Sequence, residues 1–162
     1  MGASNDIPVC ILAGGGSRRF GSNKALAKLN GRPLIAHVIG RLAPQTDAAI
    51  AVNCKDEEPF ADFELPIVED RKWVGEGPLS GIFAALNWAK AQGQNQIATI
   101  AVDLPVLPTG LLEALSSAGA PSIAASGERK HPVNGLWATS QIKDLDQYLG
   151  EGGRSAHGWA EA

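Results

Sequence analysis

Short apolar segments alternate with longer segments of helical periodicity along the chain. Ile7–Leu12 and Ile97–Val102 are nearly continuous apolar runs rich in β-branched residues, a pattern typical of strands buried on both faces of a sheet. The same reasoning predicts further strands at Asp47–Val52, Leu65–Val68, Ser122–Ala125 and Val133–Ala138. Ser126–His131 is then a polar turn between the last two strands.

Helical segments separate these strands. Leu79, Ile82, Phe83 and Leu86 recur at the spacing of one helix face, which predicts an amphipathic helix that ends near Gly93. Other helices are predicted over Lys24–Leu29, from Pro33 to Pro44, after an N-cap at Thr109, and over Gln141–Leu149. Because buried strands alternate with helices, we expect an α/β fold. It should be a single-domain, Rossmann-like three-layer αβα sandwich with a mostly parallel sheet.

Composition agrees with one globular domain. The chain has 162 residues, of which 44% are hydrophobic and 19% are charged. No run approaches the roughly 18 apolar residues that a membrane span requires, and no basic flank precedes the first apolar stretch. Cys10 lies inside an apolar run and Cys54 at the end of one, so we expect buried reduced thiols. These features predict a cytoplasmic protein that does not bind membranes.

Charge is distributed unevenly. The formal net charge of −3 argues against nucleic-acid binding. Between Ile7 and Thr46, however, the chain has six Lys and Arg residues and no Asp or Glu. A local positive field on an acidic protein suits a small, highly charged anion, although the clustering could also be chance.

The loop Ala13–Lys24 is the strongest candidate for anion binding. In parallel sheets ligands bind at the carboxyl ends of strands, where this loop, Asn53, Asp70 and Asp103 are predicted to lie. The loop combines three consecutive glycines with Arg18, Arg19 and Lys24, and therefore offers backbone N–H groups and cations to phosphates. It is neither a P-loop, because Ser22-Asn23 precede Lys24, nor a GxGxxG fingerprint, because Arg19 takes the last glycine position.

This loop resembles a known nucleotide-binding motif. Leu12-Ala13-Gly14-Gly15-x-Ser17-x-Arg19-x-Gly21, followed by Lys24, is similar to the motif of the molybdenum cofactor nucleotidyltransferases. Further family-like segments are Leu29–Leu34, Val68-Glu69-Asp70, Gly77–Gly81, Asp103-Leu104-Pro105 and His131-Pro132-Val133. The resemblance covers roughly Val9 to Arg154 and implies the nucleotide-diphospho-sugar transferase fold. Gly14-Gly15 resembles the guanylyltransferase branch, whereas cytidylyltransferases favour Leu-Ala-Ala-Gly.

The resemblance implies substrates, a metal and residue roles. GTP, Mg²⁺, and molybdopterin or Mo-molybdopterin are the implied ligands, with other cofactor-biosynthesis or acceptor proteins as implied partners. The implied catalytic residues are Arg19 and Lys24, which contact the phosphates, and Asp103, which holds Mg²⁺. Positions that match the family's nucleotide contacts are Leu12, Ala13, Gly14, Gly15, Lys24, Asn53 and Asp70. Positions that match the pterin side are Gly77, Pro78, Gly81 and Arg154.

Several alternatives stay open. Asn53 and Asp70 could simply cap strand ends, and Gly77–Gly81 could be only a turn and a helix start. The family usually has an aspartate before the lysine, where this chain has Asn23, and continues past the present Ala162 with an Asn-x-Asn-Thr-Pro-like segment. Either the chain is truncated or it lacks part of the acceptor site. A cytidylyltransferase, another nucleotidyltransferase acting on a phosphorylated small molecule, and a non-catalytic nucleotide-binding module are the competing functions.

Overall fold

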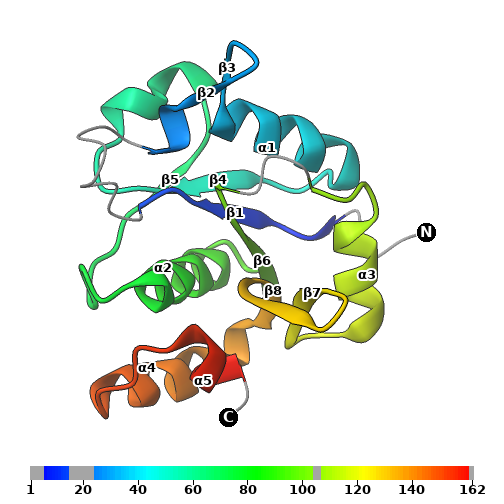
Figure 1. The fold of residues 1–162 in the computed structure, drawn as a ribbon. Coiled ribbons are helices and arrows are strands. Elements are labelled where there is room, and N and C mark those ends of the chain that lie inside the picture. The colour runs from blue at the N-terminus through cyan, green and yellow to red at the C-terminus, as the bar shows by residue number, and fades with distance from the viewer. Residues whose placement is uncertain (1–5, 15–23, 104–106, 161–162) are drawn as a thin grey trace.

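A six-stranded sheet, ordered β5-β4-β1-β6-β8-β7, forms the middle layer (Figure 1). The computed structural model describes residues 6–14, 24–103 and 107–160. The strands are β1 (Val9–Leu12), β4 (Ile50–Asn53), β5 (Ile67–Val68), β6 (Gln96–Ala101), β7 (Ser122–Ser126) and β8 (Arg129–Ala138). β1, β4, β5 and β6 run parallel, whereas β8 is antiparallel to β6 and to β7. The predicted mostly parallel sheet is confirmed.

Helices cover both faces of this sheet (Figure 1). One face packs against α1 (Leu34–Leu42) and α3 (Leu111–Ala118). The other packs against α2 (Pro78–Ala91), α4 (Ile142–Gly150) and α5 (Ala156–Ala160). Short 3-10 helices are η3 (Lys24–Leu26), η4 (Ala43–Gln45), η5 (Glu58–Phe63) and η6 (Thr139–Gln141). This is the expected three-layer αβα arrangement. Within the described ranges, no helix has both the length and the apolar character needed to cross a bilayer.

The central strand shows why its sequence is a continuous apolar run. Val9 and Ile11 pack into the core under α1 and α3, whereas Cys10 packs into the core under α2 and α4. Successive side chains point to opposite faces of a sheet, so a strand covered on both faces needs apolar residues at every position. Full burial of a side chain of this size contributes about 1.5–3 kcal/mol to folding. The alternation therefore anchors the strand that precedes the Gly-rich loop.

The two cysteines lie on opposite sides of the sheet. Both are free and buried, as expected, with Cys10 in the α2 core and Cys54 in the α1 core. Burial, followed by the nearby carboxylate of Asp56, raises the pKa of the Cys54 thiol to about 11. Burial likewise raises the pKa of Cys10 far above its usual range. Neither thiol is therefore suited to act as a nucleophile at neutral pH.

Three local predictions were wrong. The segment after η3 forms a hairpin of β2 (Lys28–Leu29) and β3 (Arg32–Pro33) instead of a helix, because Asn30 and Gly31 both adopt positive φ (52° and 80°), the geometry of a tight hairpin turn. Gly110, and not Thr109, precedes α3, with no side-chain cap. The predicted polar turn Ser126–His131 is much shorter, since β8 already begins at Arg129.

Candidate active site

The carboxyl ends of four parallel strands bring the predicted site residues to one edge of the sheet. Leu12 pairs with Asn53 on one side and with Ala101 on the other, and Asn53 pairs with Val68. The chain segments that follow these strands therefore start side by side. They carry the backbone of Ala13 and Gly14, the side chain of Asp70 and the side chain of Asp103.

Asn53 connects the first loop to the segment after β5. Its side chain is buried, and its Nδ2 donates to the carbonyl of Val68 at 2.9 Å and to Oδ1 of Asp70 at 2.8 Å. Its backbone carbonyl accepts the N–H of Ala13 at 2.8 Å. Because both donor hydrogens of the amide are used, the side chain is fixed in one orientation, and it holds the Asp70 carboxylate at the sheet edge.

Two glycines face this asparagine. A Cβ atom on Gly14 would lie 3.4 Å from Oδ1 of Asn53, an ordinary contact. A Cβ atom on Gly81, in the first turns of α2, would lie only 2.8 Å from the same oxygen and 3.1 Å from Cδ2 of Leu12. Close packing of α2 against the sheet edge therefore depends on the absence of a side chain at position 81.

Lys24, at the start of η3, and Asp103, two residues after β6, form an ion pair. Lys24 Nζ lies 3.5 Å from Asp103 Oδ2, and both side chains are about half exposed (49% and 50%). A half-exposed ion pair of this kind contributes at most about 1 kcal/mol to stability. Both groups are thus accessible to a ligand, and their pairing costs little to rearrange. Gly15 and Arg19, which were predicted to act beside them, lie outside the described residues.

The residues predicted to form the acceptor side also come together. Gly77 has a φ of 89°, α2 starts at Pro78, and Arg154 Nε donates to Oε2 of the neighbouring Glu76 at 2.6 Å. Arg154 Nη1 also donates to two carbonyls, those of Leu149 and Gly153, at 2.8 and 2.7 Å. Much of the donor capacity of Arg154 is therefore used to tie the start of α2 to the end of α4.

Trp73 forms a second connection between these two segments, and no pattern in the sequence indicated its contacts. Its indole Nε1 donates to Oδ1 of Asp146 at 2.9 Å, and Lys72 Nζ lies 2.9 Å from the same carboxylate. The hydrogen bonds from Lys72 and then Trp73 lower the pKa of Asp146. Arg154 stacks over the Trp73 ring at 5.7 Å from its centroid. These contacts join the segment between β5 and α2 to the C-terminal helices.

The donor set at the sheet edge fits a magnesium ion that is shared with a ligand. Among the described residues, no group of three or more His, Cys, Asp or Glu side chains could hold a metal ion alone. Mg²⁺ usually retains waters and is bound through one or two carboxylates together with substrate phosphates. The half-exposed carboxylate of Asp103, next to Lys24, is compatible with that mode of binding.

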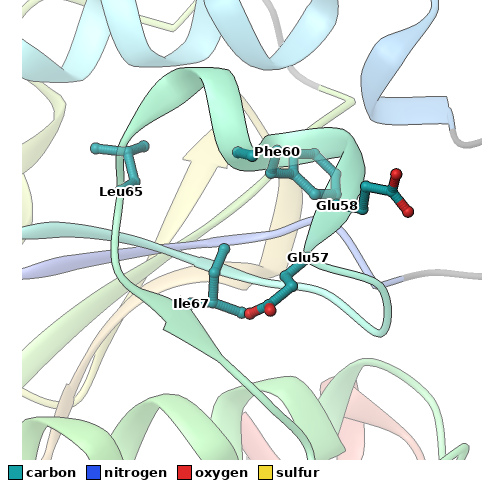
Figure 2. A pocket seen from close by; sticks show the side chains of 6 residues that line it. Glu57, Glu58, Phe60, Leu65 and Ile67 are labelled. Atoms are coloured by element: carbon teal, nitrogen blue, oxygen red, sulfur yellow. The ribbon is translucent and has the colours of Figure 1, made fainter.

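One pocket lies apart from the polar residues at the sheet edge. It has a volume of about 330 Å³ and is lined by Glu57, Glu58, Phe60, Ala61, Leu65 and Ile67. Figure 2 shows the carboxylate of Glu58 pointing away from the other labelled side chains. The rest of the lining is mainly apolar, and none of the predicted site residues contributes to it. The polar groups at the sheet edge are therefore the better candidate for chemistry.

Comparisons with known proteins identify the family of this chain. The family model described as "MobA-like NTP transferase domain" matches residues 9–160. A molybdenum cofactor guanylyltransferase from Cereibacter sphaeroides is 41% identical over 154 residues, covering 93% of this chain and 78% of that protein. One from Acidiphilium cryptum is 37% identical over 148 residues, covering 91% and 74%.

Solved structures show the same fold. Molybdopterin-guanine dinucleotide biosynthesis protein A from Archaeoglobus fulgidus superimposes with a TM-score of 0.73 at 26% identity, covering 96% of this chain and 79% of that one. A protein from Aquifex aeolicus superimposes with a TM-score of 0.80 at 23% identity, covering 98% and 84%. The chain therefore belongs to the MobA-like NTP transferase domain family and is a nucleotidyltransferase.

Proposed function

We propose that this enzyme transfers GMP from Mg-GTP to the terminal phosphate of molybdopterin, with or without bound molybdenum, and releases pyrophosphate. Residues 1–162 would act as one nucleotidyltransferase domain. The observation that carries the proposal is the meeting of Lys24 and Asp103, 3.5 Å apart, at the same sheet edge as the Asn53–Asp70 pair. The names of the guanylyltransferase relatives support the choice of nucleotide and acceptor.

The residues divide into three groups in this proposal. Lys24, with Arg19 and Gly15, would bind the triphosphate, and Asp103 would hold Mg²⁺. The backbone of Leu12, Ala13 and Gly14, with Asn53 and Asp70, would bind guanosine. Gly77 and Pro78 would face the acceptor. Gly81 would let α2 pack against Asn53 between the two sites, and Arg154 would shape the acceptor side through its bond to Glu76.

The reaction needs positioning more than a protein nucleophile. An oxygen of the acceptor phosphate attacks the α-phosphorus of GTP, a new P–O bond forms, and the bond from the α-phosphorus to the bridging oxygen breaks. Pyrophosphate leaves with the bonding electron pair. Lys24 can neutralise charge that develops on this leaving group, since its Nζ is accessible beside Asp103. Mg²⁺, when bound, would supply further charge neutralisation there.

A direct assay tests the proposal. The purified chain would be incubated with Mg²⁺, molybdopterin and either α-³²P-labelled GTP or CTP, and the labelled product would be separated from free nucleotide. We expect label transfer from GTP and pyrophosphate release, both abolished by EDTA. Preferential transfer from CTP would reassign the nucleotide. GTP binding without transfer to molybdopterin would favour a non-catalytic module.

Gly81→Ala is expected to weaken GTP binding. The added Cβ would lie 2.8 Å from Asn53 Oδ1, so Asn53 must move and its bond to Asp70 is strained. Overpacking of this kind costs about 1–3 kcal/mol of stability, and loss of one hydrogen bond to a charged group weakens binding about tenfold. Calorimetric titration with GTP measures the change. Gly40→Ala is the matched control, since a Cβ at Gly40 in α1 meets nothing within 4 Å. Equal GTP affinity in both variants would contradict the expectation.

A further inference from the structure

β8 contains a bulge that lies beside the carboxyl end of β6. β6 ends at Ala101, two residues before Asp103. In the β7–β8 ladder, Ile123 pairs with Gly135 but the next residue, Ala124, pairs with His131. Three residues of β8, Pro132, Val133 and Asn134, are therefore opposite no residue of β7. Bulges of this kind re-aim side chains and are over-represented next to active sites.

Side chains replace the backbone ladder where this bulge meets β6. The paired register between the two strands ends at Thr99 and Gly135. Beyond that pair, Thr99 Oγ1 donates to the carbonyl of Val133 at 2.7 Å, and the N–H of Ala101 donates to Oδ1 of Asn134 at 2.7 Å. Trp137 Nε1 donates to Thr99 Oγ1 at 2.9 Å. These side-chain bonds hold the carboxyl end of β6 against the bulge.

The polar side chains of this network are shielded from solvent. Thr99 and Asn134 are buried, with 0% and 4% of their surface exposed, and Trp137 is buried beside them. On the other side of β6, the N–H of Val102 donates to the carbonyl of Leu12 at 3.3 Å. The two residues before Asp103 are thus each held by a backbone N–H. The N–H of Ala101 bonds Asn134 on one side of β6, and the N–H of Val102 bonds Leu12 of β1 on the other.

We propose that Asn134 is a positioning residue, which fixes the end of β6 so that the carboxylate of Asp103 faces the bound metal and phosphates. The inference rests on the proposed role of Asp103 in holding Mg²⁺. Asn134 contacts Asp103 only through the backbone of Ala101 and Val102, and it acts by the acceptor oxygen of its side chain. Supporting residues behind a metal ligand commonly change metal affinity about 10- to 100-fold when they are replaced.

The test uses Asn134→Leu, which keeps the branched shape of the side chain at a larger volume and removes the acceptor. Mg²⁺ would be titrated calorimetrically into protein saturated with the α,β-methylene analogue of GTP, and amide exchange at Ala101 would be followed by NMR. We expect Mg²⁺ to bind about 10- to 100-fold more weakly and Ala101 to exchange faster. Binding of the analogue without Mg²⁺ should change less than about twofold. Asn134→Asp, which retains Oδ1, should restore most of the Mg²⁺ affinity.

Two controls separate positioning from general destabilisation. Thr46→Val removes a buried hydroxyl that donates to the carbonyl of Ile7 at 2.6 Å, before β1 begins. It should lower Tm by about 2–4 °C without changing Mg²⁺ affinity. If Asn134→Leu does not fold, Thr99→Val takes its place, with the same expected loss of Mg²⁺ affinity. It removes the bond to the Val133 carbonyl and the acceptor of the Trp137 N–H, which hold the bulge that carries Asn134.

The outcomes are distinguishable. Wild-type Mg²⁺ affinity in Asn134→Leu, together with weakened affinity in Asp103→Asn, would overturn the positioning role and leave the proposed function standing. Wild-type Mg²⁺ affinity in both Asn134→Leu and Asp103→Asn would show that the metal is held elsewhere. That result would overturn both the metal-binding role of Asp103 and the positioning role of Asn134. Equal weakening in Thr46→Val and Asn134→Leu would reduce the effect to stability alone.

Discussion

Asp103→Asn is expected to lower kcat by about a thousandfold while the protein stays folded. The substitution keeps the shape of the side chain and removes the charge that would hold Mg²⁺ against the phosphates. A metal that neutralises the transition state contributes several kcal/mol, and each 1.36 kcal/mol corresponds to a factor of ten in rate. Stability should change by less than about 1 kcal/mol, because the side chain is half exposed and its ion pair with Lys24 is a surface pair.

Steady-state transfer of labelled GMP and thermal unfolding together check this expectation. Asp47→Asn is the matched control, because Asp47 is an exposed carboxylate before β4, at the opposite edge of the sheet. Its kcat should equal that of the wild type. Turnover above about one tenth of the wild-type rate in Asp103→Asn would remove this carboxylate from the reaction.

Lys24→Gln is expected to lower kcat/KM for GTP by about 100- to 1,000-fold. The ammonium group lies 3.5 Å from Asp103 and would turn to the phosphates once that carboxylate binds the metal. Removing one such stabilising group from a transition state typically costs this factor. Lys24→Arg should recover part of the loss, since it keeps the charge but changes the geometry of the donors.

Initial rates over a range of GTP concentrations measure the effect. Lys28→Gln is the appropriate control, because Lys28 is an exposed lysine in β2, only four residues further along the same basic segment. It removes the same charge from the region without removing the group beside Asp103. A similar loss in both variants would mean that the general positive field, and not a contact made by Lys24, accounts for the effect.

The sheet edge could be predicted because it depends on local pattern and on a general rule. Continuous apolar runs identify strands buried on both faces, and parallel strands place their carboxyl ends together. The positions of Asn53, Asp70 and Asp103 at one edge follow from those two facts, and the pairing of Leu12 with Asn53 and Ala101 agrees with them. The roles assigned to these residues stay predictions until the variants are measured.

The contacts around the proposed acceptor side could not be predicted. Trp73 and Asp146 are 73 positions apart in sequence, and Glu76 and Arg154 are 78 apart. Their contacts depend on how α4 packs against α2, which no local periodicity encodes. The hairpin at Asn30-Gly31 is different, because the Asn-Gly pair is itself a turn signal that was available in the sequence. The β8 bulge gave no comparable signal beyond Pro132, which is tolerated in sheets mainly at bulges and edges.

The close approach of Gly81 to Asn53 couples the proposed nucleotide side of the site to the proposed acceptor side. The floor of the proposed guanosine site and the first turn of α2, which begins at the proposed acceptor side, pack together without room for a side chain at position 81. A change that enlarges either half must move the other. Under the proposed function, the choice of nucleotide and the choice of acceptor are therefore coupled, and re-engineering one of them requires compensating substitutions across that interface.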